Sequence, residues 1–255
     1  MKITILGSGT SQGVPVIACE CNVCKSENTK DKRLRSSIMI DVDNQKLIID
    51  TGPDFRQQML REKVQNINAV LFTHHHKDHV AGMDDIRAFN HKWKKDVNVY
   101  CNLTTEKALH NEFPYVFSNE NYPGIPKVKI NNFDNKKFKI NETIIIPIQA
   151  YHYKLPVFGF RIYNFVYLTD VSFIPAKEKQ KMKKADLIIL DALRQTKHIS
   201  HFSLEEAVNI LQELKPKRAL LTHISHLMGL HDLVDDNLPN NINLAYDGQS
   251  LSLDL

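Results

Sequence analysis

The sequence predicts an α/β fold in which two mixed β-sheets stack face to face with helices on their outer sides. Two observations lead to this prediction. Short β-rich runs alternate with helical segments in both halves of the chain, and several of these runs are continuously apolar. Continuous apolar runs are typical of strands that are covered on both faces. The 255 residues, 42% of them hydrophobic, suit one domain over residues 1–255 with a large core.

The first half of the chain is expected to contain five strands, at residues 3–6, 37–42, 46–50, 69–72 and 97–100. One helix is expected over residues 54–63, after a Gly-Pro pair, and another over residues 80–93. The stretch 112–126 contains three prolines among aromatic and asparagine residues, so we expect a loop there. The sequence leaves open whether this loop forms a lid over a site.

The second half repeats this mixture of strands and helices. Ser203 and Glu206 form a capping-box pattern, which predicts a helix from Ser203 to Leu214. Another helix is expected over residues 176–184. Strands are expected at residues 143–150, 157–163, 165–168, 186–190, 219–222, 243–245 and 251–253. This order predicts a four-layer sandwich with helices outside two sheets.

Composition and charge narrow the class of protein. No apolar run approaches the roughly 20 residues that cross a membrane, so we expect a cytoplasmic protein without a membrane partner. The net charge of +4 is mild and fits an anionic substrate. It does not favour a dedicated nucleic-acid binder, although it leaves nucleic acid open as a partner.

A cluster of histidine and aspartate residues follows the apolar strand at residues 69–72. His74 and His76 are two residues apart, so they point the same way on an extended chain. Asp78 and His79 follow where the chain turns into a helix. Imidazole and carboxylate ligands together suit Zn²⁺, Fe or Mn²⁺. The pattern therefore predicts a metal site.

This H-x-H-x-D-H pattern resembles the hallmark of the metallo-β-lactamase superfamily, whose fold is the αββα sandwich expected above. The resemblance implies two divalent metal ions, Zn²⁺ or Mn²⁺. It implies that His74, His76 and His152 bind one ion and that Asp78, His79 and His223 bind the other. It further implies that Asp170 bridges both ions and that Asp50 accepts the free N–H of a ligand imidazole.

Three cysteines form the pattern C-x-C-x-x-C at Cys19, Cys21 and Cys24. Three thiolates at this spacing can wrap one structural Zn²⁺ and leave one tetrahedral position for a fourth ligand. His226, three residues beyond His223, is our candidate for that position. We therefore expect a zinc-binding loop at about residues 13–35.

The cysteine pattern, the segment Gly9–Pro15 and the sequence Leu221–His226 together narrow the resemblance. They resemble the phosphoribosyl 1,2-cyclic phosphate phosphodiesterase branch, which is related to the pyrroloquinoline-quinone synthesis protein B group. The resemblance implies a small anionic phosphodiester substrate, a cyclic or ribose phosphate, attacked by a hydroxide held between two metal ions. A homodimer is compatible with it.

The leaving alkoxide needs a proton, and His201 is our candidate general acid. Asp191 is expected to orient His201 and to hold it protonated. Three alternatives stay open. An RNA-processing nuclease like the tRNA 3′-end endonuclease has a similar metal set, although we find no insertion comparable to its long substrate-gripping arm. An ester hydrolase of the same fold would not need the Asp–His acid, and a non-catalytic metal protein would lack part of the site.

Overall fold

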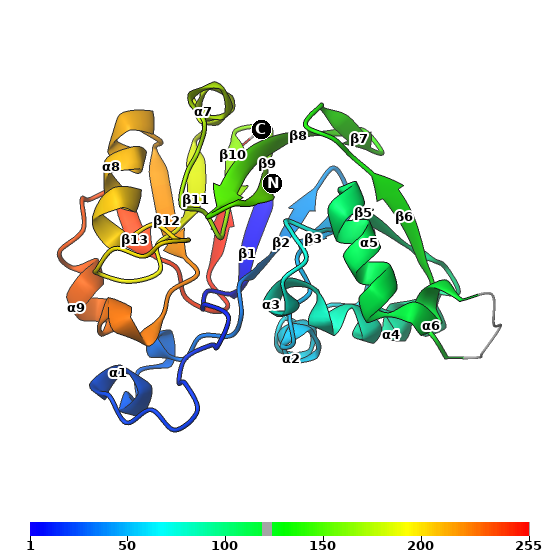
Figure 1. The fold of residues 1–255 in the computed structure, drawn as a ribbon, viewed down its shortest axis with the longest axis horizontal. Helices are drawn as coiled ribbons and strands as arrows, with labels where there is room; N and C mark the ends of the chain where they lie inside the picture. The colour runs from blue at the N-terminus through cyan, green and yellow to red at the C-terminus, as the bar shows by residue number, and fades with distance from the viewer. Residues whose placement is uncertain (119–123, 255) are drawn as a thin grey trace.

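The strands form two seven-stranded sheets in the computed structural model, which describes residues 1–118 and 124–254 (Figure 1). The strand order is β14-β1-β2-β3-β4-β5-β6 in the first sheet and β13-β12-β11-β10-β9-β8-β7 in the second. The first sheet consists of β1 (Lys2–Gly7), β2 (Ser37–Val42), β3 (Gln45–Ile49), β4 (Ala69–Leu71), β5 (Val97–Cys101), β6 (Val128–Asn132) and β14 (Ser250–Ser252). The second consists of β7 (Phe138–Ile140), β8 (Thr143–His152), β9 (Leu155–Ile162), β10 (Phe165–Leu168), β11 (Leu187–Asp191), β12 (Arg218–Thr222) and β13 (Ile242–Leu244).

Both sheets are mixed, as the sequence predicts. In the first sheet β14, β1, β2 and β3 pair antiparallel, whereas β3, β4, β5 and β6 pair parallel. In the second sheet the strands from β7 to β10 pair antiparallel, and those from β10 to β13 pair parallel. Consequently β8, β10, β11 and β12 all run in one direction, and their carboxyl ends meet at one edge.

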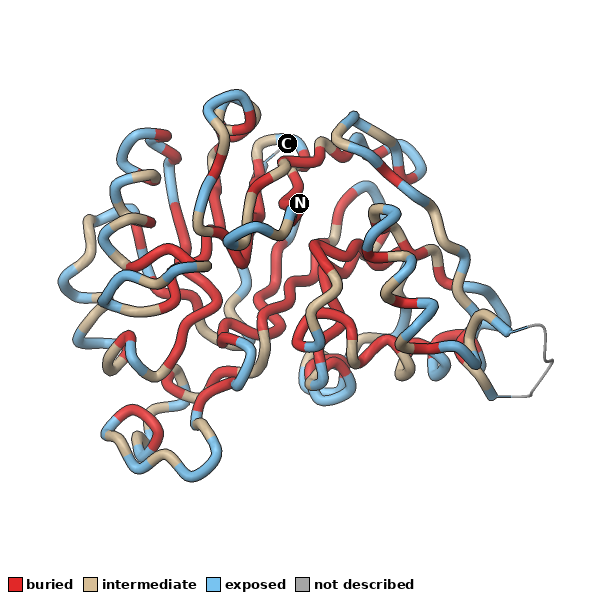
Figure 2. The backbone as a smooth tube through the Cα atoms, in the orientation of Figure 1, coloured by how far each residue is buried: buried red, intermediate tan, exposed pale blue. Residues whose placement is uncertain are grey.

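The core between the two sheets follows the period of two along the strands. Ile38 and Ile40 of β2 pack into one cluster with Phe160 and Tyr167 of the second sheet. Met39, between them, faces the opposite way into a cluster with helical residues. The strands are largely buried, whereas the outer helices alternate between buried and exposed residues (Figure 2).

Helices cover the outer face of each sheet, which completes the four layers. The first sheet packs against α2 (Phe55–Arg61), α4 (Arg87–Trp93), α5 (Leu103–Glu112) and a 3₁₀ segment at Ala81–Ile86. The second packs against α7 (Ala176–Met182) and α8 (Leu204–Leu214). The capping box of Ser203 and Glu206 is present at α8. The remaining short helices are α1 (Asn22–Lys25), α3 (Lys77–Val80), α6 (Pro114–Phe117) and α9 (His231–Asp235), with 3₁₀ segments at Thr29–Asp31 and His226–Met228. No helix among the described residues is both long and apolar enough to cross a membrane.

The prediction of one continuous helix over residues 80–93 is wrong. The chain forms α3, the 3₁₀ segment Ala81–Ile86 and α4 in succession. Gly82 explains the break, because its N–H donates to Thr51 O at 2.8 Å instead of to the preceding helical turn. A Cβ on Gly82 would lie 2.1 Å from Gly52 O, so the backbones touch here and only glycine fits.

The loop predicted at residues 112–126 is also partly wrong, because Pro114–Phe117 form α6 with proline in the first turn. Tyr115 of α6 donates a hydrogen bond from its hydroxyl to Asp84 at 2.5 Å. Residues 119–123 of the expected loop, and the question of a lid there, lie outside the described residues. The sequence analysis also missed α5, which Asn102 caps by accepting from Thr105 N–H at 2.7 Å, and the short strands β6 and β7.

Candidate active site

The predicted site residues gather where the carboxyl ends of strands from both sheets meet. His152, Asp170, Asp191 and His223 lie at or just after the ends of β8, β10, β11 and β12, which run in the same direction. The residues His74–His79 follow β4 of the first sheet, and Asp50 follows its neighbour β3. The carboxyl ends of parallel strands are the usual place for ligand sites in α/β folds.

Three groups of side chains have potential ligand atoms within 4.8 Å of one another. One group is His74, His76 and Asp170, and another is His152, Asp170 and His201. The third is Asp78, His79, Asp170 and His223. Asp170 belongs to all three, which places it at the centre of the site.

The two carboxylate oxygens of Asp170 face different histidines. Oδ2 lies 3.8 Å from His74 Nε2. Oδ1 lies 3.3 Å from His79 Nε2 and 2.9 Å from His223 Nδ1. His79 Nε2 also lies 3.2 Å from Asp78 Oδ2. This is the arrangement that a carboxylate bridging two cations requires.

Buried nitrogen atoms without hydrogen-bond partners show that the site fits metal ions. His74 Nε2, His79 Nε2 and His223 Nδ1 are buried and make no hydrogen bond within the described part of the chain. An unpaired buried polar atom costs roughly 1–3 kcal/mol. All three nitrogens face carboxylate oxygens, and a cation between nitrogen and oxygen satisfies both.

Hydrogen bonds on the far side of the rings fix which nitrogen is free to bind. Asp50 Oδ2 accepts from His79 Nδ1 at 2.7 Å and from the Thr73 hydroxyl at 2.8 Å. Thr73 Oγ1 in turn lies 3.0 Å from His74 Nδ1, whose N–H it can accept. His152 Nδ1 donates to Ser200 O at 2.8 Å. His74, His79 and His152 therefore each keep Nε2 as an acceptor for a cation.

Three residues of the site adopt left-handed backbone conformations. Asp50, Asp170 and His223 have φ values of 64°, 57° and 58°. Aspartate and histidine tolerate this region better than most residues, but it still stores strain. Asp50 and His223 directly follow a strand and Asp170 follows β10 after one residue, so a sharp turn at each strand end aims the side chain toward the centre of the site.

The electrostatics of the site favour an ionised Asp170. Burial opposes ionisation, but the neighbouring His223 and His79 rings hold the pKa of this carboxyl well below its usual range. Burial likewise opposes charge on His79, and Asp170, Asp78 and Asp50 nevertheless raise its pKa well above the usual value. A positive charge at His79 Nε2, whether a proton or a metal ion, is thus strongly favoured.

His201 and Asp191 form a pair next to this cluster. His201 Nδ1 lies 3.3 Å from Asp191 Oδ2, and the His201 ring stacks on His223 with centroids 4.9 Å apart. Burial and then His223 lower the pKa of His201 to about 3. Burial and then Asp170 raise the pKa of Asp191 well above its usual range. Both shifts run against a His201 that Asp191 holds protonated, so this role of Asp191 stays a prediction.

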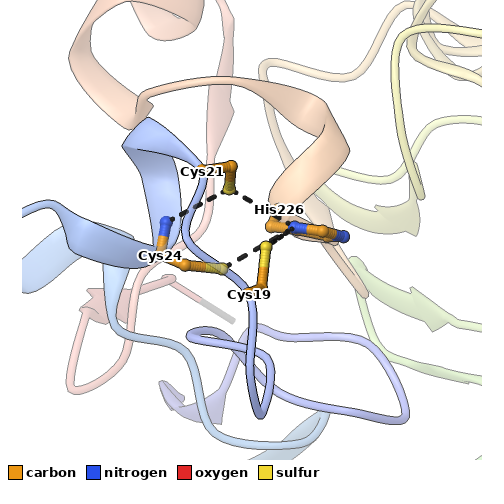
Figure 3. Close-up of side chains that lie close together, drawn as sticks. All are labelled: Cys19, Cys21, Cys24 and His226. Atoms are coloured by element: carbon orange, nitrogen blue, oxygen red, sulfur yellow. Dashed lines mark hydrogen bonds between the residues drawn. The ribbon is translucent and has the colours of Figure 1, made fainter.

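The cysteine cluster gathers around His226, three residues beyond His223 in the sequence, and Figure 3 shows its three thiols pointing toward that ring. The Sγ atoms of Cys19, Cys21 and Cys24 lie 3.2, 3.4 and 3.6 Å from His226 Nδ1. A tetrahedral Zn²⁺ with its usual bond lengths would separate such sulfur and nitrogen atoms by about 3.5 Å. The four side chains thus fit the expected zinc site, which ties α1 to the segment after β12.

The structure brings together every side chain that the sequence analysis placed in either site. It adds three residues that the sequence analysis did not single out. Thr73 contacts both Asp50 and His74, and its place directly before the motif was an available signal. Thr10 Oγ1 lies 3.2 Å from His223 Nε2, and Ser200 contributes a backbone carbonyl. No local pattern marks these two contacts.

Comparisons with known proteins agree with this geometry. The family model of the beta-lactamase superfamily domain matches residues 45–224. The crystal structure of a new diphosphatase from the PhnP family has a TM-score of 0.93 at 37% identity, covering 100% of this chain and 98% of that one. Zn(2+)-bound PqqB from Methylobacterium extorquens has a TM-score of 0.82 at 18% identity, covering 99% and 100% of the two chains, and shows the shared fold alone.

A curated relative is similar over the whole of this chain. The octanoyltransferase of Porphyromonas gingivalis is 36% identical over 257 residues, which cover 100% of this chain and 52% of the relative. The chain therefore spans about half the length of that relative.

Proposed function

The chain belongs to the beta-lactamase superfamily, and from that premise we propose that it is a metal-dependent phosphodiesterase that cleaves a small cyclic or ribose phosphate diester. A hydrolase is supported by the fold and by the similarity to a diphosphatase of the PhnP family. The phosphodiester as substrate is the part that we infer.

One observation carries the proposal. His201 lies within reach of both His152 and Asp170, and the Asp191 carboxyl stands behind it. An imidazole backed by a carboxyl beside a two-cation site is the arrangement needed to protonate a leaving alkoxide. Hydrolysis of an ester with a more stable leaving group would not need it.

We assign His74, His76 and His152 to one cation and Asp78, His79 and His223 to the other, with Asp170 between them. His152 is grouped with Asp170 and His201, and its ring lies 5.1 Å from that of His76. Bound there, divalent cations supply Lewis-acid polarisation of phosphoryl oxygens and lower the pKa of water. The chain itself orients the ligands. Asp50 fixes the tautomer of His79 directly and that of His74 through Thr73.

The proton for the leaving group comes from the pair of Asp191 and His201. Because the two groups interact closely, they share one proton as a unit. In the free protein burial raises the pKa of Asp191 and lowers that of His201, so both shifts favour the uncharged form of each group. An anionic phosphate beside His201 favours the imidazolium: Nδ1 takes the proton from Asp191, and Nε2 gives its own proton to the leaving oxygen, which leaves a neutral imidazole and an Asp191 carboxylate.

The test is hydrolysis of a ribose cyclic phosphate and of bis(p-nitrophenyl) phosphate by the Mn²⁺- or Zn²⁺-loaded chain. We expect Asp78→Ala to abolish both activities. His201→Ala should lower the rate on the ribose phosphate by about 10²–10⁴-fold, the usual contribution of a general acid. It should affect bis(p-nitrophenyl) phosphate less, because p-nitrophenolate leaves without a proton.

His198→Ala is the matched control, since the His198 ring lies 5.3 Å from that of His201 but belongs to none of the three groups. Metal content separates a general acid from a ligand: His201→Ala should retain both active-site ions. Loss of an ion, or equal losses on both substrates, would contradict the role of His201. Cleavage of p-nitrophenyl octanoate instead of either phosphate would show an ester hydrolase.

A further inference from the structure

A cavity of about 490 Å³ opens directly beside the candidate metal ligands His76 and His152. Its other walls include Tyr153, Lys154 and Ile199. Tyr153 and Ile199 are 53% and 70% exposed, so an aromatic and an aliphatic side chain are accessible beside the metal ligands. The cavity thus combines an aromatic face, an aliphatic face and one cation next to the reacting centre.

Tyr153 and Lys154 form the two-residue loop between β8 and β9, where His152 pairs with Leu155. The loop is held in place, because Tyr153 N–H donates to Ser172 Oγ at 3.0 Å and that hydroxyl donates to Tyr151 O at 3.1 Å. The φ of Tyr153 is 56°, a conformation that favours glycine or asparagine. A tyrosine therefore occupies a strained position of this loop.

A second hairpin in the same sheet carries a tyrosine at the same position of its loop and serves as a comparison. Tyr163 begins the two-residue loop between β9 and β10 with a φ of 52°, and its hydroxyl donates to Asp43 at 2.9 Å. Within the described part of the chain, the side chains of Tyr153 and Lys154 make no hydrogen bond or ion pair. Their contact is with each other, with Lys154 Nζ 5.3 Å from the centroid of the Tyr153 ring.

The cavity borders the segment that leads into His201, the proposed general acid. Ile199 and Ser200 directly precede His201, the residue that protonates the leaving oxygen, and Ser200 O accepts from His152. Resting on the proposed function, we propose that this cavity binds the leaving group and that the leaving group is a nucleotide. Its base stacks on Tyr153 opposite Ile199, and its own phosphate pairs with Lys154.

The chemistry of the walls selects this class of ligand. A planar base offers a face to an aromatic ring and an apolar surface to Ile199, which an unsubstituted sugar phosphate does not. Lys154 adds a positive charge to the wall, and a base without a phosphate would leave that charge without a partner. A substrate with both parts joins the reacting phosphate to a sugar hydroxyl of a nucleoside monophosphate, so that the P–O bond breaks and the nucleotide leaves as the alkoxide that His201 protonates.

The test measures binding of AMP and of ribose 5-phosphate to the metal-loaded chain by calorimetry. Both ligands carry a phosphate that can pair with Lys154, so their ratio isolates the contribution of the base. We expect AMP to bind roughly 5- to 150-fold tighter, the range for one stacked base. Tyr153→Ala should abolish this difference and Tyr153→Phe should retain it. Lys154→Met should weaken AMP roughly two- to fivefold.

Tyr163→Ala is the matched control, because it removes a tyrosine from the same position of the neighbouring hairpin. It should leave the ratio unchanged. Equal binding of AMP and ribose 5-phosphate, or equal effects of Tyr153→Ala and Tyr163→Ala, would overturn the proposal. Neither ligand is a diester, so the assay measures binding without hydrolysis and is independent of the proposed activity. If the chain prefers AMP but hydrolyses no phosphodiester, the proposed function is wrong and the cavity is still a nucleotide-binding site.

Discussion

Replacing Asp50 by asparagine should impair metal binding without a change in any ligand. Asp50 is fully buried, and its Oδ1 accepts from Thr73 N–H at 2.8 Å while Oδ2 accepts from His79 Nδ1 and the Thr73 hydroxyl. An asparagine has one oxygen and one NH₂ group. In one orientation the NH₂ group faces the Thr73 N–H, and in the other it faces His79 Nδ1 and the Thr73 hydroxyl. The second orientation is satisfied only if His79 moves its proton to Nε2, the nitrogen that faces Asp78 and Asp170 and would bind the metal.

The size of the effect can be obtained in two ways. A hydrogen bond to a charged group contributes about 1.5–3 kcal/mol. Loss of the group that orients a ligand histidine usually lowers metal affinity by about 10–100-fold. That range corresponds to about 1.4–2.7 kcal/mol, so the two values agree. We therefore expect Asp50→Asn to weaken the ion bound by Asp78, His79 and His223 by one to two orders of magnitude.

The assay is competition between the metal-free chain and a chelator of known affinity, followed for wild type and variant. Asp247→Asn is the control, because both Asp247 oxygens likewise accept hydrogen bonds, from the N–H groups of Ser8 and Leu34, but Asp247 contacts no candidate ligand. It should lower thermal stability and leave metal affinity unchanged. Wild-type affinity in Asp50→Asn, or an equal loss in Asp247→Asn, would refute the reasoning.

Three further predictions concern stability and the second metal site. His226→Ala should remove one zinc ion per chain and lower the melting temperature, as elemental analysis and calorimetry would show; an unchanged zinc count would contradict the cysteine site. Phe160→Ala, between the sheets, should cost about 3–5 kcal/mol of unfolding free energy, whereas Ile144→Ala, half-exposed, should cost far less; equal losses in denaturant titrations would argue against the core described here. Burial and then Arg33 lower the pKa of His231 to about 4. As the pH falls, the unfolded chain therefore binds this proton before the folded chain does, and the free energy of unfolding should decrease between about pH 6.5 and 4. His231→Gln should reduce this pH dependence, and a variant with the same pH dependence as wild type would contradict the prediction.

The layered fold could be predicted because its signals are local. Strands such as β2 and β3 carry apolar residues on both faces, and Ser203 and Glu206 mark the start of α8. The break in the helix predicted at residues 80–93 could not be predicted in this way. It depends on the contact of Gly82 with Thr51 and Gly52, about 30 positions away in the sequence.

The residues of the candidate site also differ in how far they could be predicted from local sequence. His74, His76, Asp78 and His79 stand next to one another in the sequence, so their pattern alone indicates a metal. His152, Asp170 and His223 were reached only through the resemblance to a family, because a single histidine or aspartate after a strand is not informative by itself. Tyr153 and Lys154 gave no signal, since a tyrosine is not a usual residue for a two-residue hairpin loop.

The most direct test of a two-cation phosphodiesterase is a single titration. Zinc is added to the metal-free chain while the initial rate of bis(p-nitrophenyl) phosphate hydrolysis is recorded. Three thiolates and a histidine should take up the first equivalent without activity. Activity should then rise and reach its plateau at three equivalents per chain. A plateau at two equivalents, or no hydrolysis at any loading, would contradict the account.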